Sequence, residues 1–138
     1  MNSYLDELER TGNSLMVYKE GELIFESQSK GIRPYLEAID SLKKDLGGTT
    51  VVDKIVGRAA ALLIIYIKAR KAYASVLSQP AKQVLDKYDF PVYFSTLVDQ
   101  IKLKDGRIFC PFERMVQGIS DPERAYMEIL KKMNEFRP

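Results

Sequence analysis

The sequence contains no histidine and no tryptophan, and its single cysteine is Cys110. Structural and catalytic zinc sites draw on several cysteine and histidine ligands, so a thiolate–imidazole zinc site is excluded. Ser–His and Cys–His nucleophile pairs are excluded for the same reason. One cysteine cannot form an internal disulfide, so nothing indicates an oxidising compartment. These absences predict a protein with no bound metal and no cofactor.

The chain also lacks a long hydrophobic run and a strong charge of either sign. Its longest apolar run, residues 59–67, is far shorter than the ~20 residues that a helix needs to cross a bilayer. A net charge of +2 provides no field that would attract nucleic acid. The N-terminus is polar and acidic, unlike a signal peptide. We expect a cytoplasmic protein with no membrane or nucleic-acid partner; the oligomeric state stays open, a homo-oligomer included.

The composition that remains is that of an ordinary globular protein. Hydrophobic residues make up 46% of the 138 residues and charged residues 29%. The chain shows no internal repeat, no low-complexity tract and no linker. Residues 1–138 are therefore predicted to form one domain.

Hydrophobic patterns predict an α/β protein: a three-layer α-β-α sandwich with a mixed sheet of four or five strands. Two β-rich runs, 14–19 and 22–26, flank a Gly-containing turn and predict a hairpin. Residues 51–69, after a Thr49–Thr50 N-cap, are expected to form a central buried helix, because the segment is apolar nearly all round beyond Arg58. The other expected elements are helices at 5–10, 32–46, 78–88, 111–117 and 122–136 and strands at 72–77 and 91–97.

Three charged residues, Asp53, Lys54 and Arg58, gather at the start of the expected 51–69 helix, with Gly57 leaving space between them. A helix N-terminus presents unpaired N–H groups that suit an anionic ligand or a polarised oxygen. Buried charges need partners, so the cluster either pairs internally or faces a pocket. In the alternative interpretation, Asp53 only complements the helix dipole while Lys54 and Arg58 reach solvent.

Two further polar positions are Cys110 and Ser78. Cys110 stands at the expected N-cap of a short helix, with Glu113 at its third position. The helix start lowers the pKa of such a thiol, which Glu113 opposes and Arg114 partly restores. The alternative is a small buried hydrophobe beside a capping glutamate. Ser78 lies at a strand-to-helix corner, where serine most often serves as an N-cap.

Three segments, Arg10–Leu15, Val52–Leu62 and Cys110–Glu113, together carry a resemblance. As a set they resemble a small bacterial family of unknown function whose fold is grouped with the cytidine deaminases. The resemblance spans about residues 5–117 and leaves the helix at 122–136 outside. It implies a cytidine-deaminase-like fold in which the Asp53 helix start and the Ser78 corner meet beside a pocket at one end of the sheet.

The zinc machinery of the deaminases is missing from the corresponding positions. In that fold a helix brings a His or Cys and a Glu to the metal, and the next strand-to-helix corner supplies Pro-Cys-x-x-Cys. Here the helix start carries Asp53-Lys54, and the corner reads Ser78-Gln79-Pro80-Ala81. The resemblance therefore implies a topology and a pocket, and it does not imply deaminase activity.

Three functional hypotheses follow, of which we place ligand binding without assigned catalysis first. The first is a protein that binds a small, nucleoside- or nucleotide-like ligand without the zinc machinery. The second is a catalytically inert protein-interaction or regulatory module. The third is an unusual metal-dependent hydrolase or deaminase that uses Asp53, Cys110 and Glu113. The candidate ligand-binding residues are Asp53, Lys54, Arg58 and Ser78, and the candidate catalytic residues are Asp53, Lys54, Cys110 and Glu113.

Overall fold

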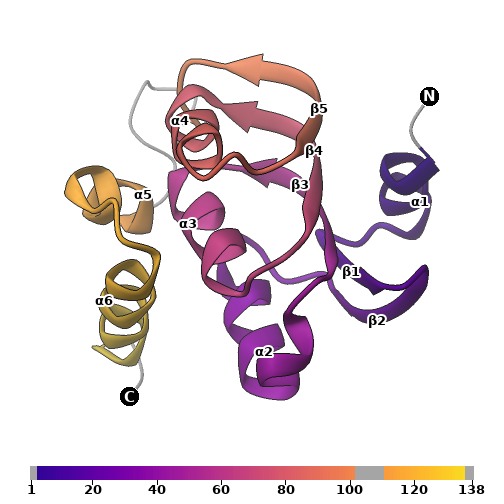
Figure 1. Cartoon of the computed structure of the whole chain (residues 1–138), viewed down its shortest axis with the longest axis horizontal. Helices are drawn as coiled ribbons and strands as arrows, with labels where there is room; N and C mark the ends of the chain where they lie inside the picture. The colour runs from indigo at the N-terminus through magenta and orange to yellow at the C-terminus, as the bar shows by residue number, and fades with distance from the viewer. Residues whose placement is uncertain (1–2, 102–110, 136–138) are drawn as a thin grey trace.

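A computed structural model of the chain describes residues 3–101 and 111–135, and Figure 1 shows how their elements are arranged. Within these residues five strands form one mixed sheet, accompanied by six α-helices. The strands are β1 (Leu15–Lys19), β2 (Glu22–Ser27), β3 (Thr50–Val56), β4 (Lys71–Ser78) and β5 (Val92–Val98). The helices are α1 (Ser3–Thr11), α2 (Arg33–Leu42), α3 (Arg58–Tyr66), α4 (Gln79–Lys87), α5 (Pro111–Met115) and α6 (Pro122–Glu135), with 3₁₀ turns η1 (Lys43–Leu46) and η2 (Val116–Gly118).

The sheet has the strand order β2-β1-β3-β4-β5. β1 pairs antiparallel with β2, which confirms the predicted hairpin, and its turn residues Glu20 and Gly21 both have the positive φ of a tight two-residue connection. β1 also pairs antiparallel with β3, whereas β3, β4 and β5 are parallel. The carboxyl ends of the parallel strands lie at one end of the sheet, where α3 and α4 begin. Open α/β sheets bind their ligands at this end.

The prediction of a helix over 51–69 is wrong for the first half of that segment, because Thr50–Val56 forms strand β3 and α3 begins only at Arg58. Most residues of β3 are β-branched, and such side chains favour strands over helices. The N-cap of α3 is Gly57, with extended backbone, and not the Thr49–Thr50 pair. Asp53 and Lys54 are therefore consecutive strand residues rather than members of one helical face.

Helix α3 lies at the centre of the main core, and its residues Ala59–Ile64 are all buried. The burial predicted for the apolar part of this helix is confirmed. In Figure 1, helices α2 to α6 lie on one side of the sheet and α1 lies on the other. Helix α1 covers a second, smaller cluster that contains Leu8, Met16 and Val52. No helix of the described residues is long and apolar enough to cross a membrane.

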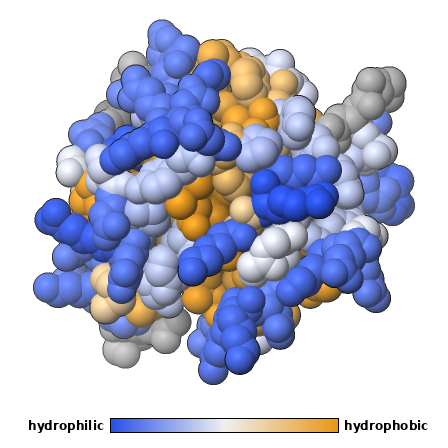
Figure 2. Space-filling model, in the orientation of Figure 1, coloured by the Kyte–Doolittle hydropathy of each residue, from blue (hydrophilic) through white to orange (hydrophobic). Residues whose placement is uncertain are grey.

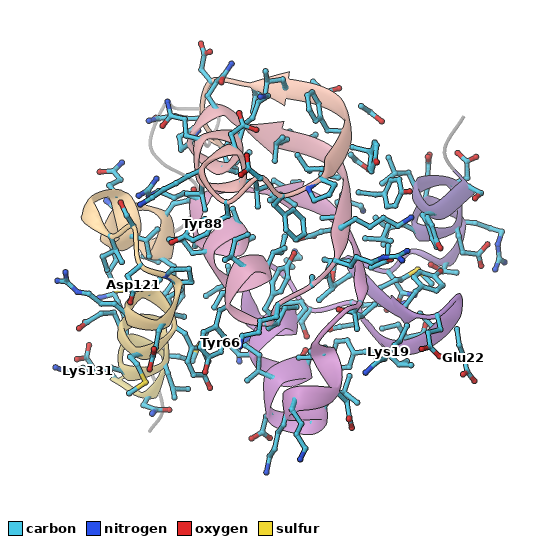
Figure 3. The ribbon with its side chains drawn as sticks, in the orientation of Figure 1. Lys19, Glu22, Tyr66, Tyr88, Asp121 and Lys131 are labelled. Carbon is cyan, nitrogen blue, oxygen red and sulfur yellow. The ribbon has the colours of Figure 1, made fainter. Side chains whose placement is uncertain are left out.

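The C-terminal helix α6 packs its apolar face against α3 and belongs to the main core. The Tyr66 ring at the end of α3 stacks on Tyr126 of α6, with centroids 4.3 Å apart. Tyr88, which follows α4, donates a hydrogen bond to the carbonyl of Ser120 at 3.3 Å. Figure 3 labels Tyr66 and Tyr88, and both lie toward the α5–α6 segment. This segment is therefore fixed to the helices that cover the sheet.

Candidate functional site

Asp53, the middle residue of β3, is the central polar residue of the site. The hydroxyl of Tyr35, on α2, donates a hydrogen bond of 2.6 Å to Asp53 Oδ2. Both residues are almost fully buried, with 6% of Asp53 and 2% of Tyr35 exposed. Pro34 in the first turn of α2 fixes the start of the helix that carries Tyr35. The sheet and α2 thus hold a carboxyl–phenol pair in the interior.

The environment of Asp53 favours its neutral form. Burial raises the pKa of Asp53 from 3.8 to about 7, because the carboxylate loses its hydration. Hydrogen bonds from the Tyr35 hydroxyl and from the backbone N–H groups of Ile55 and Lys54 oppose this increase in pKa. Burial also raises the pKa of Tyr35 well above its ordinary range, and the neighbouring Asp53 adds to this effect. Near neutral pH the Asp53 carboxyl can therefore accept or donate a hydrogen bond.

A pocket of about 470 Å³ lies beside Asp53. This volume falls within the range of small-molecule sites, which are mostly apolar with a few converging polar groups. The end of β3, the start of α3 and the loop before α2 form its walls. Ile32, Ile55, Ala60 and Ile101 supply apolar lining, and Asp53 is its most deeply buried polar side chain. We call this cavity the Asp53 pocket.

Two lysines also line the Asp53 pocket. Lys54 follows Asp53 on β3, and Lys30 lies in the loop between β2 and α2. Both residues are exposed. A lysine ammonium is a flexible point charge, and phosphate and carboxylate groups are its usual ligands. The pocket therefore combines a buried carboxyl with cations that reach solvent.

The start of α3 is occupied by a carboxylate of the chain itself. Glu113, on α5, accepts hydrogen bonds from the backbone N–H groups of Arg58 and Ala59, each at 2.6 Å. Gly57 makes this approach possible, because a Cβ there would lie 2.6 Å from Glu113 Oε1. Burial raises the pKa of Glu113, and the two backbone hydrogen bonds oppose the increase. The helix N-terminus that the sequence suggested for an anionic ligand is therefore capped from a distant segment.

Arg58 holds the same distant segment with its side chain. Its Nε donates to the carbonyl of Val116 at 2.9 Å, and its Nη2 donates to the carbonyl of Ile119 at 2.6 Å. A longer contact of 3.4 Å reaches the Ser120 hydroxyl. Arg58 does not line the Asp53 pocket but a neighbouring hollow. Its guanidinium therefore links α3 to the turn after α5 by hydrogen bonds.

Ser78 caps helix α4, as its position at the strand-to-helix corner predicted. Its hydroxyl accepts a hydrogen bond from the N–H of Ala81 at 3.2 Å, and the residue is buried. Ser78 and Arg58 line a small hollow of about 40 Å³ that shares Glu113 with the Asp53 pocket. The structure therefore brings Asp53, Lys54 and Glu113 into one pocket. It places Arg58 and Ser78 beside that pocket.

Cys110, a candidate catalytic residue, lies outside the described residues, so the site geometry does not include it. The described residues contain no group of three or more acidic or thiol side chains placed to hold a metal ion. Both carboxylate oxygens of Glu113 already accept backbone hydrogen bonds. The metal-dependent hypothesis therefore gains no support from the part of the chain that the structure describes.

Sequence reasoning missed Tyr35 and Lys30. Tyr35 stands on the apolar side of the helical pattern at 32–46, where an aromatic residue is typical of a core. A buried tyrosine hydroxyl nevertheless needs a partner, and Asp53 was the polar residue of the neighbouring buried segment. That requirement is the signal that could have linked the two residues. No local pattern pointed to Lys30.

Comparison with known proteins shows which family the chain belongs to. A family model for the TM1506 domain of unknown function, DUF1893, matches residues 3–133. The chain belongs to the DUF1893 family. It is also similar to the crystal structure of a DUF1893 family protein, TM1506 from Thermotoga maritima, at 31% identity over 96% of this chain and 92% of that one, with a TM-score of 0.83. No curated protein matches the chain.

The DUF1893 assignment confirms the expected kinship with a family of unknown function. The family description assigns no activity and no ligand. The hydrogen-bonded pair of Tyr35 and Asp53 is the part of this DUF1893 chain that lends itself most readily to a direct test.

Replacing Tyr35 by phenylalanine should raise the pKa of Asp53 further, because the Tyr35 hydroxyl is the largest contribution that lowers it. At pH 8 the free energy of unfolding should fall by roughly 1–3 kcal/mol, since a buried carboxylate loses a hydrogen-bond donor. Carbon-13 NMR titration of the Asp53 carboxyl measures the first effect. Tyr88→Phe removes a hydroxyl hydrogen bond elsewhere and is the control. An unchanged pKa in Tyr35→Phe would refute the assigned role of this bond.

Proposed function

We propose that this chain is a cytoplasmic bacterial protein that binds a small nucleoside- or nucleotide-like ligand in the Asp53 pocket, without zinc chemistry. The observation that carries the proposal is a buried carboxyl on the wall of a pocket of about 470 Å³. Burying an ionisable group costs free energy, so such a group is retained where its chemistry is used. Apolar walls with a few converging polar groups are typical of ligand sites.

The pocket lining corresponds to the parts of such a ligand. The apolar side chains would cover a planar ring. The Asp53 carboxyl would bond to the polar edge of that ring, because it can accept or donate a hydrogen bond near neutral pH. Lys30 and Lys54 would contact a phosphate or another anionic group. The start of α3 would not contribute, because Glu113 occupies its N–H groups.

The proposal includes a three-layer, cytidine-deaminase-like scaffold. Its support is the strand order, in which an antiparallel hairpin precedes three parallel strands, and the position of the pocket at the carboxyl end of β3. The ligands of open α/β sheets bind at this end. Because the histidine and cysteine ligands of zinc are missing from the corresponding positions of this sequence, we propose binding and not deamination.

Proton transfer by Asp53 is a second candidate function. A carboxyl with a pKa of about 7 exchanges its proton near neutral pH, as general acids and bases do. Tyr35 would then be a positioning residue. In this case Asp53→Asn would retain ligand binding and lose turnover of that ligand, whereas in the binding function it would lose affinity.

Thermal unfolding with a panel of nucleosides and nucleoside monophosphates tests the proposed function. A ligand that binds only the folded state raises the melting temperature. We expect at least one member of the panel to do so, and Asp53→Asn to reduce the shift. Lys54→Ala should reduce the shift of phosphorylated ligands more than that of the nucleosides, because it removes only the cation.

Two matched variants control for the loss of a charge. Asp6→Asn removes an exposed carboxyl on α1, and Lys131→Ala removes an exposed lysine on α6, labelled in Figure 3. Neither residue lines the Asp53 pocket, so both variants should keep the wild-type shift. If no member of the panel changes the melting temperature, or if Asp53→Asn leaves the shift intact, the proposed function is wrong.

A further inference from the structure

Strand β5 forms an edge of the sheet that no strand of the described residues covers, because it pairs with β4 alone. Its residues, Val92–Val98, carry no charge, and Tyr93, Phe94 and Leu97 are 51%, 38% and 37% exposed. Figure 2 shows apolar surface at the top of the view, where Figure 1 places β5. An uncharged apolar edge whose outer backbone N–H and C=O groups pair with no strand of the described residues is a template for another strand.

The opposite edge of the same sheet is protected against such pairing. Strand β2 carries Glu22 and Glu26, and its pairing with β1 is irregular between Val17 and Tyr18. Charges and bulges at an edge strand discourage the addition of a further strand. The two edges therefore differ in the property that governs association, and among the residues that the structure describes β5 is the edge that is open to a further strand.

We propose that β5 pairs antiparallel with β5 of a second copy of this chain about a two-fold axis, which joins the two sheets into one. Because the strand is uncharged, identical strands can face each other without contact between like charges. An axis at Ser95, the middle residue of β5, places Tyr93 of one copy opposite Leu97 of the other. Such an interface uses the same patch on both copies, as two-fold dimers do.

Charges at the ends of β5 favour a second copy as the occupant. Lys71 begins β4 beside the start of β5, and Asp99 directly follows its end. Antiparallel pairing brings the start of one β5 next to the end of the other, so Lys71 of each copy approaches Asp99 of the other. The Lys71 ammonium lies 5.5 Å from the Tyr73 ring, on the face that carries Tyr93. This complementarity is repeated on both sides of the two-fold axis.

A row of tyrosine rings leads across the sheet to the same edge. Tyr18 lies 4.9 Å from Tyr4, Tyr4 lies 5.0 Å from Tyr73, and Tyr73 stacks on Tyr93 at 5.0 Å between ring centroids. Tyr93 ends the row and has half of its surface exposed. In the proposed dimer Leu97 of the second copy covers this exposed ring, and aromatic rings contribute much of the energy of protein interfaces.

Disulfide cross-linking tests the two-fold register. Ser95→Cys in a Cys110→Ser background should form a disulfide-linked dimer on mild oxidation, because facing residues of antiparallel strands have Cβ atoms about 5 Å apart. Val92→Cys in the same background is the control. Its two copies would lie about 20 Å apart along the paired strands, too far for a disulfide.

Light scattering after size exclusion, over a range of micromolar concentrations, measures the oligomeric state. The full chain should have the mass of a dimer, and Ser95→Lys should have that of a monomer, because two lysines would meet at the axis. Leu23→Lys introduces the same charge on β2, at a residue with the 37% exposure of Leu97, and should remain dimeric. Circular dichroism verifies that each variant is folded.

A monomer at every concentration would overturn the proposal. A dimer that persists in Ser95→Lys, or one that cross-links at position 92 as readily as at 95, would also overturn it, because a different surface would then make the contact. A dimer that cross-links at 95 and dissociates in Ser95→Lys supports it. The edge of β5 does not line the Asp53 pocket, so these results are independent of the proposed ligand.

Discussion

Gly57→Ala should lower the free energy of unfolding by about 3 kcal/mol. This is the contribution of two hydrogen bonds to a charged group, reduced because the released groups regain part of their hydration. Gly57 has φ −98° and ψ −174°, a conformation that alanine adopts without strain. The cost arises because the new Cβ would lie 2.6 Å from Glu113 Oε1 and 2.7 Å from its Cδ. The carboxylate must move away, and the N–H groups of Arg58 and Ala59 lose their acceptor.

A double-mutant cycle isolates this contact. Glu113→Ala should cost a similar amount, because it removes the acceptor outright. In the Glu113→Ala background, Gly57→Ala should be neutral or stabilising by up to about 1 kcal/mol, since alanine restricts the unfolded chain more than glycine does. Urea unfolding of the four proteins gives the coupling energy between the two positions.

Gly118→Ala is the matched control, because a Cβ there meets no atom within 4 Å. It should change stability by less than about 0.5 kcal/mol, as surface substitutions generally do. If the losses from Gly57→Ala and Glu113→Ala add up in the double variant, Glu113 does not cap α3 in the way described here.

The contribution of Asp53 to the free energy of unfolding should decrease as the pH rises from about 4 to about 7. The pKa of this carboxyl is about 7 in the folded protein and ordinarily 3.8, so the folded chain retains a proton that the unfolded chain releases in this window. Because the folded state binds more protons, each increase in pH favours unfolding until Asp53 is ionised in both states. The contribution is therefore largest at acid pH and is lost above the folded pKa.

Asp53→Asn cannot titrate and lacks this dependence. The stability of the variant relative to the wild type should therefore increase between pH 5 and pH 8. Other titrating groups, such as Glu113, are present in both proteins and largely cancel in the difference. Urea unfolding at the two pH values measures the difference in free energy of unfolding between the two proteins. Asp6→Asn is the control for the loss of one exposed carboxyl on α1. A difference that is the same at pH 5 and pH 8 would show that Asp53 has no raised pKa.

The elements that could be predicted have strong local signals. The hairpin has Gly21 in a turn that requires positive φ, and helix α4 has Ser78 as its side-chain cap with Pro80 behind it. Helix α6 begins at Pro122 after Asp121, whose side chain accepts a hydrogen bond from the N–H of Arg124 at 2.9 Å. In each case residues within one turn of each other determine the local structure.

Strand β3 could not be separated from α3 by such signals. An apolar strand runs through Gly57 directly into an apolar helix, and a short apolar run fits either structure. The Thr49–Thr50 pair resembles an N-cap, and it therefore predicts a helix start ahead of Asp53 and Lys54. The helical face that was predicted to group Asp53 with Lys54 does not exist, although both residues line the same pocket.

The partners within the site are long-range contacts, which no local pattern encodes. Asp53 meets Tyr35 only because α2 packs on the face of β3 that carries the carboxyl. One interpretation of the sequence made Glu113 the capping residue of its own short helix, but its oxygens instead cap α3, far away in the chain. Arg58 was expected at a ligand or in solvent, and its guanidinium binds backbone carbonyls of the segment after α5. These roles follow from tertiary packing.

A proton–nitrogen NMR titration with nucleosides and nucleoside monophosphates shows whether the Asp53 pocket binds a small ligand. Ligand binding there predicts saturable shifts of backbone amides in the pocket lining, at Gly31, Ile32, Lys54, Ile55 and Gly57. Asp53→Asn should weaken or abolish these shifts. Spectra that no compound changes, or saturable shifts confined to a surface away from these amides, would contradict ligand binding in the Asp53 pocket.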